Sequence, residues 1–401
     1  MAVVNVLPAD GKVVAEGPVG CSVDVCCDDF RHLDIGLPPE ILRLKDAGYL
    51  AQAVAACDRL LEQSPDPSLA ACVRAERYRM IETSFHFSVS RDQAIAMIRE
   101  EWPEFTEDQF DDLIDRKRID WRFIDGELFV LDNFLDSLRV YPKEVPGLRP
   151  DSTDGTALRN QMLKKMESQG GLSRAITLKA SVSVPGALEG ETVRAWLPVA
   201  AACRQQSHIE ILDMTPEGVL APANALARTA SWVSSADRSF SVTYRYLIDA
   251  AYCDIYGGAL PAHPCMDAPL PKDIYEDRPH IAFTPYLQQL TEHVIDGLED
   301  QLDRARAIYD YLTHHIDYRY QPPYLLLGSI ADDCAHSLRG DCGVMALTFI
   351  TMCRIAGVPA RWQSGLYVAP DSVGSHDWAE FYTPQTGWLN ADVSFGSSAR
   401  R

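Results

Sequence analysis

Residues 339–343 read Arg-Gly-Asp-Cys-Gly and open an apolar run over 344–355 that contains neither Pro nor Gly. Gly357-Val358-Pro359 then supplies a helix stop, so the pattern predicts a helix that begins at Asp341-Cys342. A thiol is a strong nucleophile only as the thiolate, which a helix N-terminus and a neighbouring imidazolium both favour. Cys342 is therefore a candidate nucleophile at a helix N-terminus.

A second pattern supplies the partners that such a thiol needs. Residues 376–382 alternate with the period of a strand, 383–387 have turn chemistry, and a further strand follows. A hairpin centred on the Pro of that turn places His376 opposite Asp392, and one centred on the following Gln places them diagonally on the same face. In both registers the carboxylate can orient the imidazole, whereas a slip of one residue would send Asp392 to the other face.

These motifs together resemble the core of the transglutaminase-like superfamily. The residues that carry the resemblance are 340–343, 353–361, Gly365, 376–382 and 388–392. It is specific over about the last seventy residues and extends by element order to about residue 280. The resemblance implies a papain- or transglutaminase-like core, with a helix carrying the Cys packed on an antiparallel sheet. It also implies that Cys342 is the nucleophile, His376 the general base and acid, and Asp392 the residue that orients His376.

Members of the superfamily that the chain resembles include protein cross-linking enzymes, peptide N-glycanases and many bacterial proteins described as candidate cysteine proteases. The roles imply a thioester at Cys342, formed from a peptide or protein amide and resolved by water or by an amine. The chain would then be a peptidase, amidase or acyltransferase. The alternative is an inactive scaffold that keeps the fold and binds a protein partner.

The tetrahedral intermediate of such a reaction requires hydrogen-bond donors for its oxyanion. Backbone N–H groups at the helix start are expected to supply one donor. The second donor is expected upstream, from Tyr318, Tyr320, Gln321 or Tyr324, and the residues leave the choice among them open. Trp378 shares the face of His376 and is expected to form a wall beside the site.

Composition limits the partners and the compartment. The 401 residues carry 37 basic and 57 acidic side chains, and the formal net charge of −20 argues against nucleic acid and anionic membrane as partners. The start of the chain has no basic region followed by a long apolar core, so we expect a cytoplasmic protein. The sequence does not determine the oligomeric state.

The eleven cysteines are scattered without paired Cys-x-x-Cys motifs, which argues against a disulfide scaffold. The local group of Cys21, Cys26, Cys27 and His32 is a poor zinc site because vicinal cysteines are awkward tetrahedral ligands. The stretch 332–336 reads as a polar loop before the catalytic helix rather than a metal site. We therefore expect neither a metal nor another cofactor.

The chain as a whole predicts an α+β multidomain protein. Five parts are expected: an irregular arm over 1–37, a mainly helical region over 38–141, a linker over 142–172, a β-sandwich over 173–268 and the catalytic core over 280–401. The sandwich is expected from alternating strands that turn-rich segments separate. The chain ends nine residues after Asp392 with no closing element expected, a pattern that a truncated chain would show.

The helical region is expected to contain two parts. The first is an antiparallel helix pair interrupted at 64–68. The second, over 86–140, has two capped helices and an Asp-Gly hairpin, and resembles a winged helix. The second capped helix carries five acidic residues that phosphates would repel, so we expect packing or protein contact rather than DNA binding.

Overall fold

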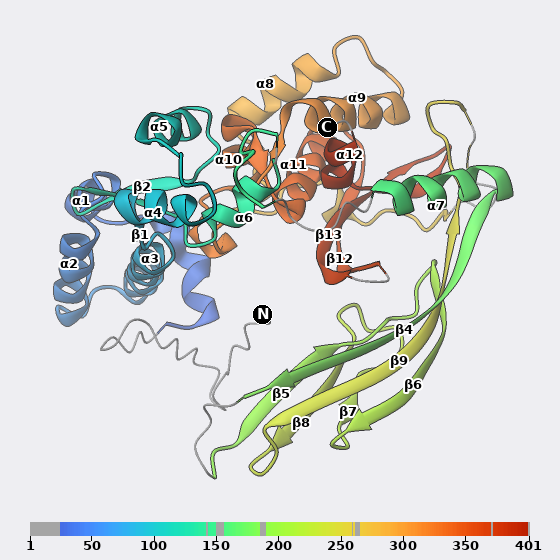
Figure 1. The fold of residues 1–401 in the computed structure, drawn as a ribbon, viewed down its shortest axis with the longest axis horizontal. Helices are drawn as coiled ribbons and strands as arrows, with labels where there is room; N and C mark the ends of the chain where they lie inside the picture. The colour runs from blue at the N-terminus through green and yellow to red at the C-terminus, as the bar shows by residue number, and fades with distance from the viewer. Residues whose placement is uncertain are drawn as a thin grey trace. The chain divides into compact units, whose positions relative to one another are not determined.

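The computed structural model describes residues 25–141, 143–149, 156–184, 190–258, 260, 265–369 and 372–399. The chain combines helices with several antiparallel sheets (Figure 1). It divides into two compact units, one of residues 1–36, 64–78 and 157–262 and the other of residues 37–63, 79–156 and 263–401. Cys21, Arg400 and most of the predicted N-terminal arm lie outside the described residues. In the part that the structure describes, no helix is long and apolar enough to cross a bilayer.

The first unit is built on two antiparallel sheets of three strands each. Their strands are β4 (Gly171–Ser183), β9 (Ser239–Ala251) and β6 (Gln206–Thr215) in one sheet, and β5 (Val193–Pro198), β8 (Thr229–Ser234) and β7 (Val219–Leu220) in the other. Alternate side chains of both sheets, among them Ala195, Trp232 and Val242, form one buried apolar cluster. This unit also contains a short 3-10 helix, η1 (Cys27–Ile35), and most of α7 (Thr156–Gln169).

The helical region that begins at Pro39 differs from the expected helix pair at one glycine. The first helix of that pair is broken into α1 (Pro39–Asp46) and α2 (Leu50–Glu62), and α3 (Pro67–His86) follows. Gly48 takes the left-handed conformation between them, with φ of 79°. A Cβ at this position would also overlap the carbonyl of Phe123. Glycine is therefore required both by the left-handed backbone conformation and by the lack of space for a side chain.

The next segment forms the predicted helix–helix–hairpin arrangement. Its elements are β1 (Val89–Ser90), α4 (Arg91–Glu101), α5 (Glu107–Asp115), β2 (Trp121–Ile124), β3 (Glu127–Val130) and α6 (Phe134–Arg139). Ser90 and Thr106 cap α4 and α5 in reciprocal capping boxes, as the sequence predicts. Asp125 and Gly126 both have positive φ, which is the geometry of an Asp-Gly hairpin turn.

The last part of the chain begins with the two helices that the sequence predicts. They are α8 (Pro285–Val294), capped by Thr284, and α9 (Gln301–His315), capped by Asp300. The strand β10 (Asp317–Tyr318) and the 3-10 helix η3 (Tyr324–Leu326) follow. The polar loop expected over 332–336 is wrong, because these residues lie in α10 (Ile330–Ser337), where Cys334 and Ala335 are buried against α11.

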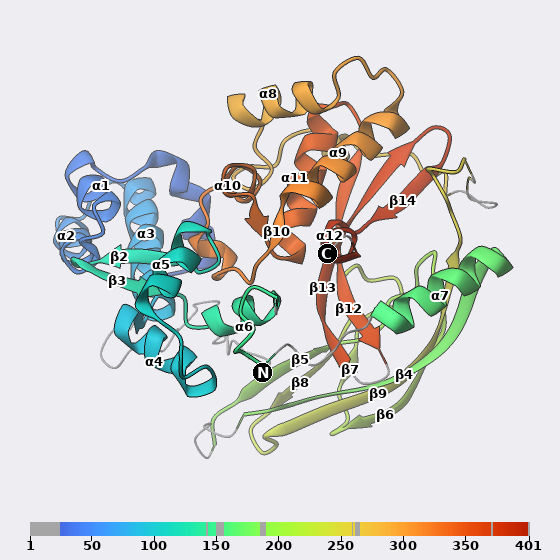
Figure 2. The same cartoon turned by 45° about the horizontal axis from the view of Figure 1, so that its top comes forward.

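The helix that carries Cys342 packs on a three-stranded antiparallel sheet (Figure 2). The elements are β11 (Arg339–Gly340), α11 (Cys342–Ile355), β12 (Ala360–Ala369), β13 (Ser372–Thr383), β14 (Gly387–Ala391) and α12 (Val393–Ala399). Nearly all of α11 is buried, which explains why its sequence is apolar on every side. The end of the chain, where no closing element was expected, forms α12.

A segment far upstream covers the outer strand of this sheet. The backbone N–H of Trp388 donates to the carbonyl of Cys265 at 2.9 Å, and its indole Nε1 donates to the carbonyl of Asp267 at 2.9 Å. Gly387 has φ of 64°, and a Cβ there would overlap the Cys265 carbonyl. The chain then passes through η2 (Pro271–Asp273) before it reaches α8.

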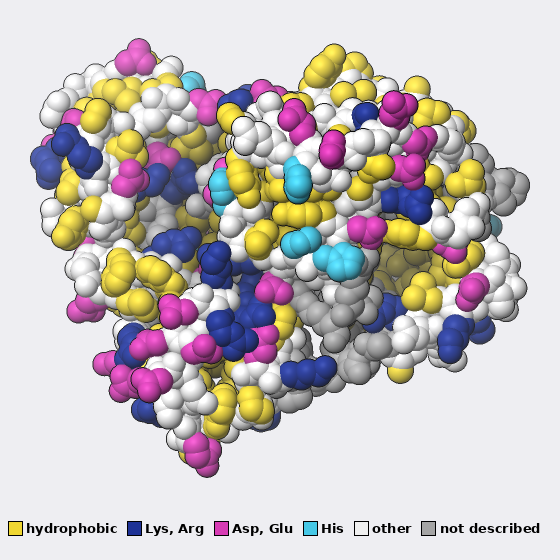
Figure 3. All heavy atoms as spheres, turned by 90° about the horizontal axis from the view of Figure 1, so that it is seen from above, with side chains coloured by type: hydrophobic (Ala, Val, Ile, Leu, Met, Phe, Trp, Pro, Cys, Tyr) yellow, Lys and Arg dark blue, Asp and Glu magenta, His cyan; other side chains and the backbone are white. Residues whose placement is uncertain are grey.

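Acidic and basic side chains are mixed on the face of the molecule that Figure 3 shows, with hydrophobic side chains between them. The net charge of −20 is therefore not spread as a uniform acidic coat on this face. The distribution of the basic side chains matters for a pocket described below.

Candidate active site

Cys342 is the first residue of α11 and is half-buried. The preceding residue, Asp341, caps the helix, because its Oδ1 accepts the N–H of Val344 at 3.0 Å. The same oxygen accepts the hydroxyl of Tyr324 at 2.6 Å. The first turn of the helix is thus held by a capping carboxylate that is itself held from the upstream loop.

The two glycines around Cys342 allow close packing at the helix start. A Cβ on Gly343 would overlap the hydroxyl of Tyr324 and would lie 3.0 Å from Oδ2 of Asp377. A Cβ on Gly340 would lie 2.6 Å from Cγ1 of Val344. Glycine at both positions is therefore required by the neighbours that surround the cysteine, rather than by backbone strain.

The strand register decides which side chains meet the cysteine. Thr383 pairs with Gly387 and Ala379 with Ala391, so the hairpin is centred on Gln385, the second of the two registers considered from the sequence. Continuing this register places His376 and Asp392 diagonally on one face. The slip that would separate them does not occur.

His376 lies between the thiol and the carboxylate. Its Nε2 is 2.6 Å from Oδ2 of Asp392, and it is hydrogen-bonded to Cys342 as well. Burial alone would lower the pKa of His376, but the hydrogen bonds and charges of Asp392 and Cys342 outweigh burial and raise the pKa to about 10. The imidazole is therefore held in the protonated form at neutral pH.

Asp392 uses its two carboxylate oxygens for different purposes. Oδ2 faces His376, whereas Oδ1 accepts the hydroxyl of Ser394 at 2.8 Å and the N–H of Phe395 at 2.9 Å. The second set of contacts caps α12. Tyr309 also donates its hydroxyl to the backbone carbonyl of Asp392 at 3.0 Å. The carboxylate that faces the histidine is consequently fixed by the helix that follows it.

Aromatic rings enclose the imidazole. The ring of Phe395 is centred 4.8 Å from that of His376, and Trp378 stacks at 6.0 Å with an angle of 24°. The His376 side chain is 12% exposed, whereas that of Asp392 is 27% exposed. Gly365 lies opposite His376 on β12, and a Cβ there would lie 3.1 Å from the indole of Trp378. The rings of Trp378 and Phe395 thus both lie against the imidazole.

The other predicted donors differ in their positions. Tyr318 pairs with Gly340 on the strand that leads into α11, and burial, together with the nearby Cys342, raises the pKa of its hydroxyl. Tyr320 packs edge-on against Tyr318 at 5.7 Å. The side-chain amide of Gln321 donates to the carbonyl of Arg319, at 3.2 Å. The hydroxyl of Tyr324 donates to Asp341, which removes it as an oxyanion donor.

Sequence reasoning missed a cluster of polar side chains at the start of α11. Asp341 and Asp377 lie there with Tyr324, and burial raises the pKa of both carboxyls. The charge of Asp377 adds to the rise at Asp341, while the hydrogen bonds from Tyr324 and Val344 oppose it. The only sequence signal for this cluster was the alternation of β13, which requires Asp377 to point away from the face that carries His376.

The remaining cysteines near the site are unlike Cys342. Cys334 and Cys353 are buried, and burial raises the pKa of Cys334 to about 12 and that of Cys353 well above its ordinary value. Among the described residues, no group of three or more His, Cys, Asp or Glu side chains could hold a metal ion. The chemistry that this arrangement can perform is that of a thiol beside an imidazolium.

A helix that begins at a cysteine and packs on an antiparallel sheet that carries a histidine gives this part of the chain a mixed α+β architecture. Residues 288–393 match the model of the transglutaminase-like superfamily, and this part of the chain is a transglutaminase-like domain. No curated protein matches the chain.

Two solved structures are similar to the chain at low identity. A candidate cysteine protease from Cytophaga hutchinsonii is 18% identical, with 56% of this chain and 77% of that one covered and a TM-score of 0.41. The periplasmic domain of TgpA from Pseudomonas aeruginosa is 16% identical, with 71% of this chain and 85% of that one covered and a TM-score of 0.33.

Proposed function

We propose that this protein is a cysteine enzyme that forms a thioester at Cys342 from a peptide or protein amide. The observation that supports the proposal is the contact of one imidazole, that of His376, with both the Cys342 thiol and the Asp392 carboxylate. A pKa of about 10 for His376 keeps an acid next to the thiol at neutral pH. A protonated imidazole stabilises a neighbouring thiolate and can protonate a leaving amine.

The reaction begins when the Cys342 thiolate attacks the amide carbonyl carbon. The carbonyl π electrons move to oxygen, and the oxyanion is expected to lie near the backbone N–H groups of the first turn of α11, which lack intrahelical partners. Collapse of the intermediate breaks the C–N bond, and the proton of His376 goes to the departing nitrogen. The products of this half-reaction are a free amine and the thioester of Cys342.

The second half-reaction regenerates the thiolate. Neutral His376 takes a proton from water, or from an incoming amine, as that molecule attacks the thioester carbon. The C–S bond then breaks, and the sulfur leaves as the thiolate beside the imidazolium. Water gives a carboxylic acid and makes the enzyme a peptidase or amidase, whereas an amine gives a new amide and makes it an acyltransferase.

Asp392 acts in this scheme by holding the imidazole through Nε2, which leaves the other ring nitrogen available to exchange a proton with the reacting groups. Tyr318 is the upstream side chain best placed to donate a hydrogen bond to the oxyanion, because its hydroxyl lies near Cys342 and its backbone pairs with Gly340. Tyr320, Gln321 and Trp378 would line the approach.

The test is selective alkylation of cysteine near neutral pH. We expect iodoacetamide to label Cys342 rapidly and Cys353 hardly at all in the folded chain, with the sites read by peptide mass spectrometry. Cys342→Ala should remove the rapid phase and any amidase activity, whereas Cys353→Ser, the matched control, should keep both. Amidase activity in Cys342→Ala would refute the assignment.

The alternative function is a scaffold that binds a protein partner without catalysis. Equal inertness of Cys342 and Cys353 toward iodoacetamide would favour it. If Cys342 is reactive, a saturating primary amine separates the two enzymatic outcomes, because amine incorporated into product identifies an acyltransferase and its absence a hydrolase.

We also propose a division of the remaining chain. The shared core of the two three-stranded sheets supports a β-sandwich module in the region 173–268, and we propose a separate, mainly helical region over 38–141. Limited proteolysis that released each part intact would support the division. We also propose a cytoplasmic location, which cell fractionation tests.

A further inference from the structure

The second unit contains a pocket of about 830 Å³ whose lining does not include Cys342, His376 or Asp392. Its walls come from α1, the end of α3, the end of α5, strand β2 and the segments around Leu326 and Arg339. This volume lies in the range of small-molecule sites in proteins. A smaller pocket of about 480 Å³ shares Ile124 with it as a lining residue.

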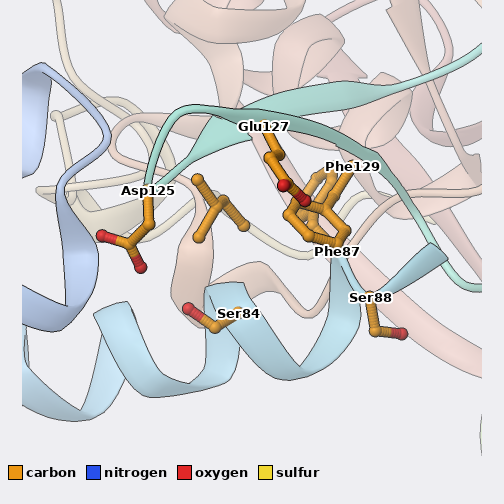
Figure 4. A pocket seen from close by; sticks show the side chains of 7 residues that line it. Ser84, Phe87, Ser88, Asp125, Glu127 and Phe129 are labelled. Atoms are coloured by element: carbon orange, nitrogen blue, oxygen red, sulfur yellow. The ribbon is translucent and has the colours of Figure 1, made fainter. Parts of the chain in front are cut away.

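The two pockets have opposite charge. The smaller one is lined by Asp125 and Glu127 and by no basic side chain, and Figure 4 shows the Glu127 carboxylate beside the rings of Phe87 and Phe129. The larger one, which we call the basic pocket, is lined by five cationic side chains and two acidic ones. The cationic residues are Lys45, Arg79, Lys117, Arg122 and Arg339, and the acidic residues are Asp46 and Asp115.

Arg122 shows how the cations face this space. Arg122 and Arg339 both line the pocket, and burial lowers the pKa of the Arg122 guanidinium. The charge of Arg339 lowers that pKa further, while Asp120 and Asp333 oppose the change. Two guanidinium groups therefore converge in a site where their repulsion is weakly screened.

The contacts of Arg122 and Arg339 within the protein use few of their N–H groups, so other N–H groups can donate to a ligand. Within the described residues, Arg122 donates one hydrogen bond, to the carbonyl of Trp121 at 2.7 Å, and lies over the ring of Phe87 at 4.7 Å. Arg339 pairs with Asp120 through Nη2 at 2.6 Å. A guanidinium has five N–H groups, so most of those on Arg122 and Arg339 remain for an anion.

We propose that the basic pocket binds a small molecule that carries two or more phosphate groups. Convergent arginines and lysines in a chain of net charge −20 favour a multiply charged anion, and guanidinium groups bind phosphate oxygens in pairs. The indole of Trp121 and the side chains of Met80 and Ile114 line the same pocket, and they would contact an organic part of the ligand. This site is independent of the thiol chemistry proposed for Cys342.

Isothermal titration calorimetry of the full chain with sodium pyrophosphate, inorganic phosphate and ATP tests the proposal. We expect one site that binds pyrophosphate, with an affinity that falls as sodium chloride is raised. Arg122→Gln removes a charged donor and should weaken binding about tenfold or more. Arg59→Gln, which removes the same charge from the exposed surface of α2 outside the pocket, should leave the affinity unchanged.

Lys117→Asn is a second pocket variant for the case in which Arg122→Gln does not fold. Lys117 is exposed and has φ of 55°, a conformation that Asn tolerates, so the fold should be retained while the affinity falls. Tighter binding of ATP than of pyrophosphate would identify an organic phosphate, and equal binding would identify a free polyphosphate. Absence of binding by all three anions at low salt, or equal weakening in Arg59→Gln, would overturn the proposal.

Discussion

Replacing Asp392 by Asn tests whether the carboxylate controls the charge of His376. Asn keeps the size of the side chain and can still cap α12 through its oxygen, but it removes the negative charge 2.6 Å from the imidazole Nε2. An opposite charge at this distance shifts a pKa by about 1 to 3 units, so we expect the pKa of His376 to fall from about 10 by that amount.

The same change alters how stability depends on pH. The pKa of His376 rises from 6.5 to about 10 on folding, and a difference of about 3.5 pH units corresponds to at most ~5 kcal/mol. Because the folded-state pKa is the higher one, this stabilisation is fully present below about pH 6.5 and is lost as the pH rises through about 10. Asp392→Asn should remove about 1.4 to 4 kcal/mol of it.

The assay combines two measurements. Titration of the His376 ring by NMR gives the pKa directly, with the resonance assigned by its loss in His376→Gln. Urea unfolding at pH 6 and pH 10 gives the stability difference, and comparison with the wild type cancels other groups that titrate in that range. Asp392→Ala should behave like Asp392→Asn but lose a further ~1 kcal/mol with the α12 cap. A pKa of His376 that is the same in Asp392→Asn as in the wild type would refute the reasoning.

Three further predictions concern the packing around the site and are checked by urea unfolding. Gly343→Ala should destabilise the fold by about 1 to 3 kcal/mol, because the new methyl group overlaps the Tyr324 hydroxyl. Gly328→Ala is the control and should change the stability little, because its methyl group would meet only Oδ2 of Asp333, at 4.0 Å. Equal effects of the two substitutions would contradict this reading. Tyr324→Phe should cost about 1 to 3 kcal/mol, since it removes a hydrogen-bond donor to half-buried Asp341. No loss of stability would mean that Asp341 finds another donor. Gly48→Ala should lower the stability by more than 1 kcal/mol, because the residue has positive φ and the new methyl group would overlap the Phe123 carbonyl. Gly36→Ala is the control that separates the two causes, because Gly36 also has positive φ but has open space around it.

The neighbourhood of Cys342 and His376 could be predicted because local patterns determine it. Apolar residues after Asp341 predict the start of α11, and strict alternation from His376 predicts β13. Both registers considered for the hairpin put Asp392 on the face of His376, so the choice between them did not affect the contact. The roles of these residues stay predictions.

The parts that could not be predicted depend on tertiary contacts. The break at Gly48 follows from the approach of the Phe123 carbonyl, which lies 75 positions away along the chain. The helix α10 contains Asp332, Asp333 and His336 among its eight residues, so its polarity resembles that of a loop, and it is stable because Cys334 and Ala335 are buried against α11. The helix α12 is short and rich in Ser and Gly, so helix propensity alone does not predict it. Propensity does not include the cap that Asp392 supplies to this helix.

The contact between Trp388 and the segment around Cys265 also affects how the sheet meets other chains. An outer strand normally offers free N–H and C=O groups that can pair with a strand of another molecule and seed aggregation. Here the start of β14 is already hydrogen-bonded to Cys265, and the indole of Trp388 is fastened to Asp267. Strand addition at this end of β14 would therefore first require the upstream segment to detach, which protects a sheet that bears His376 from intermolecular pairing.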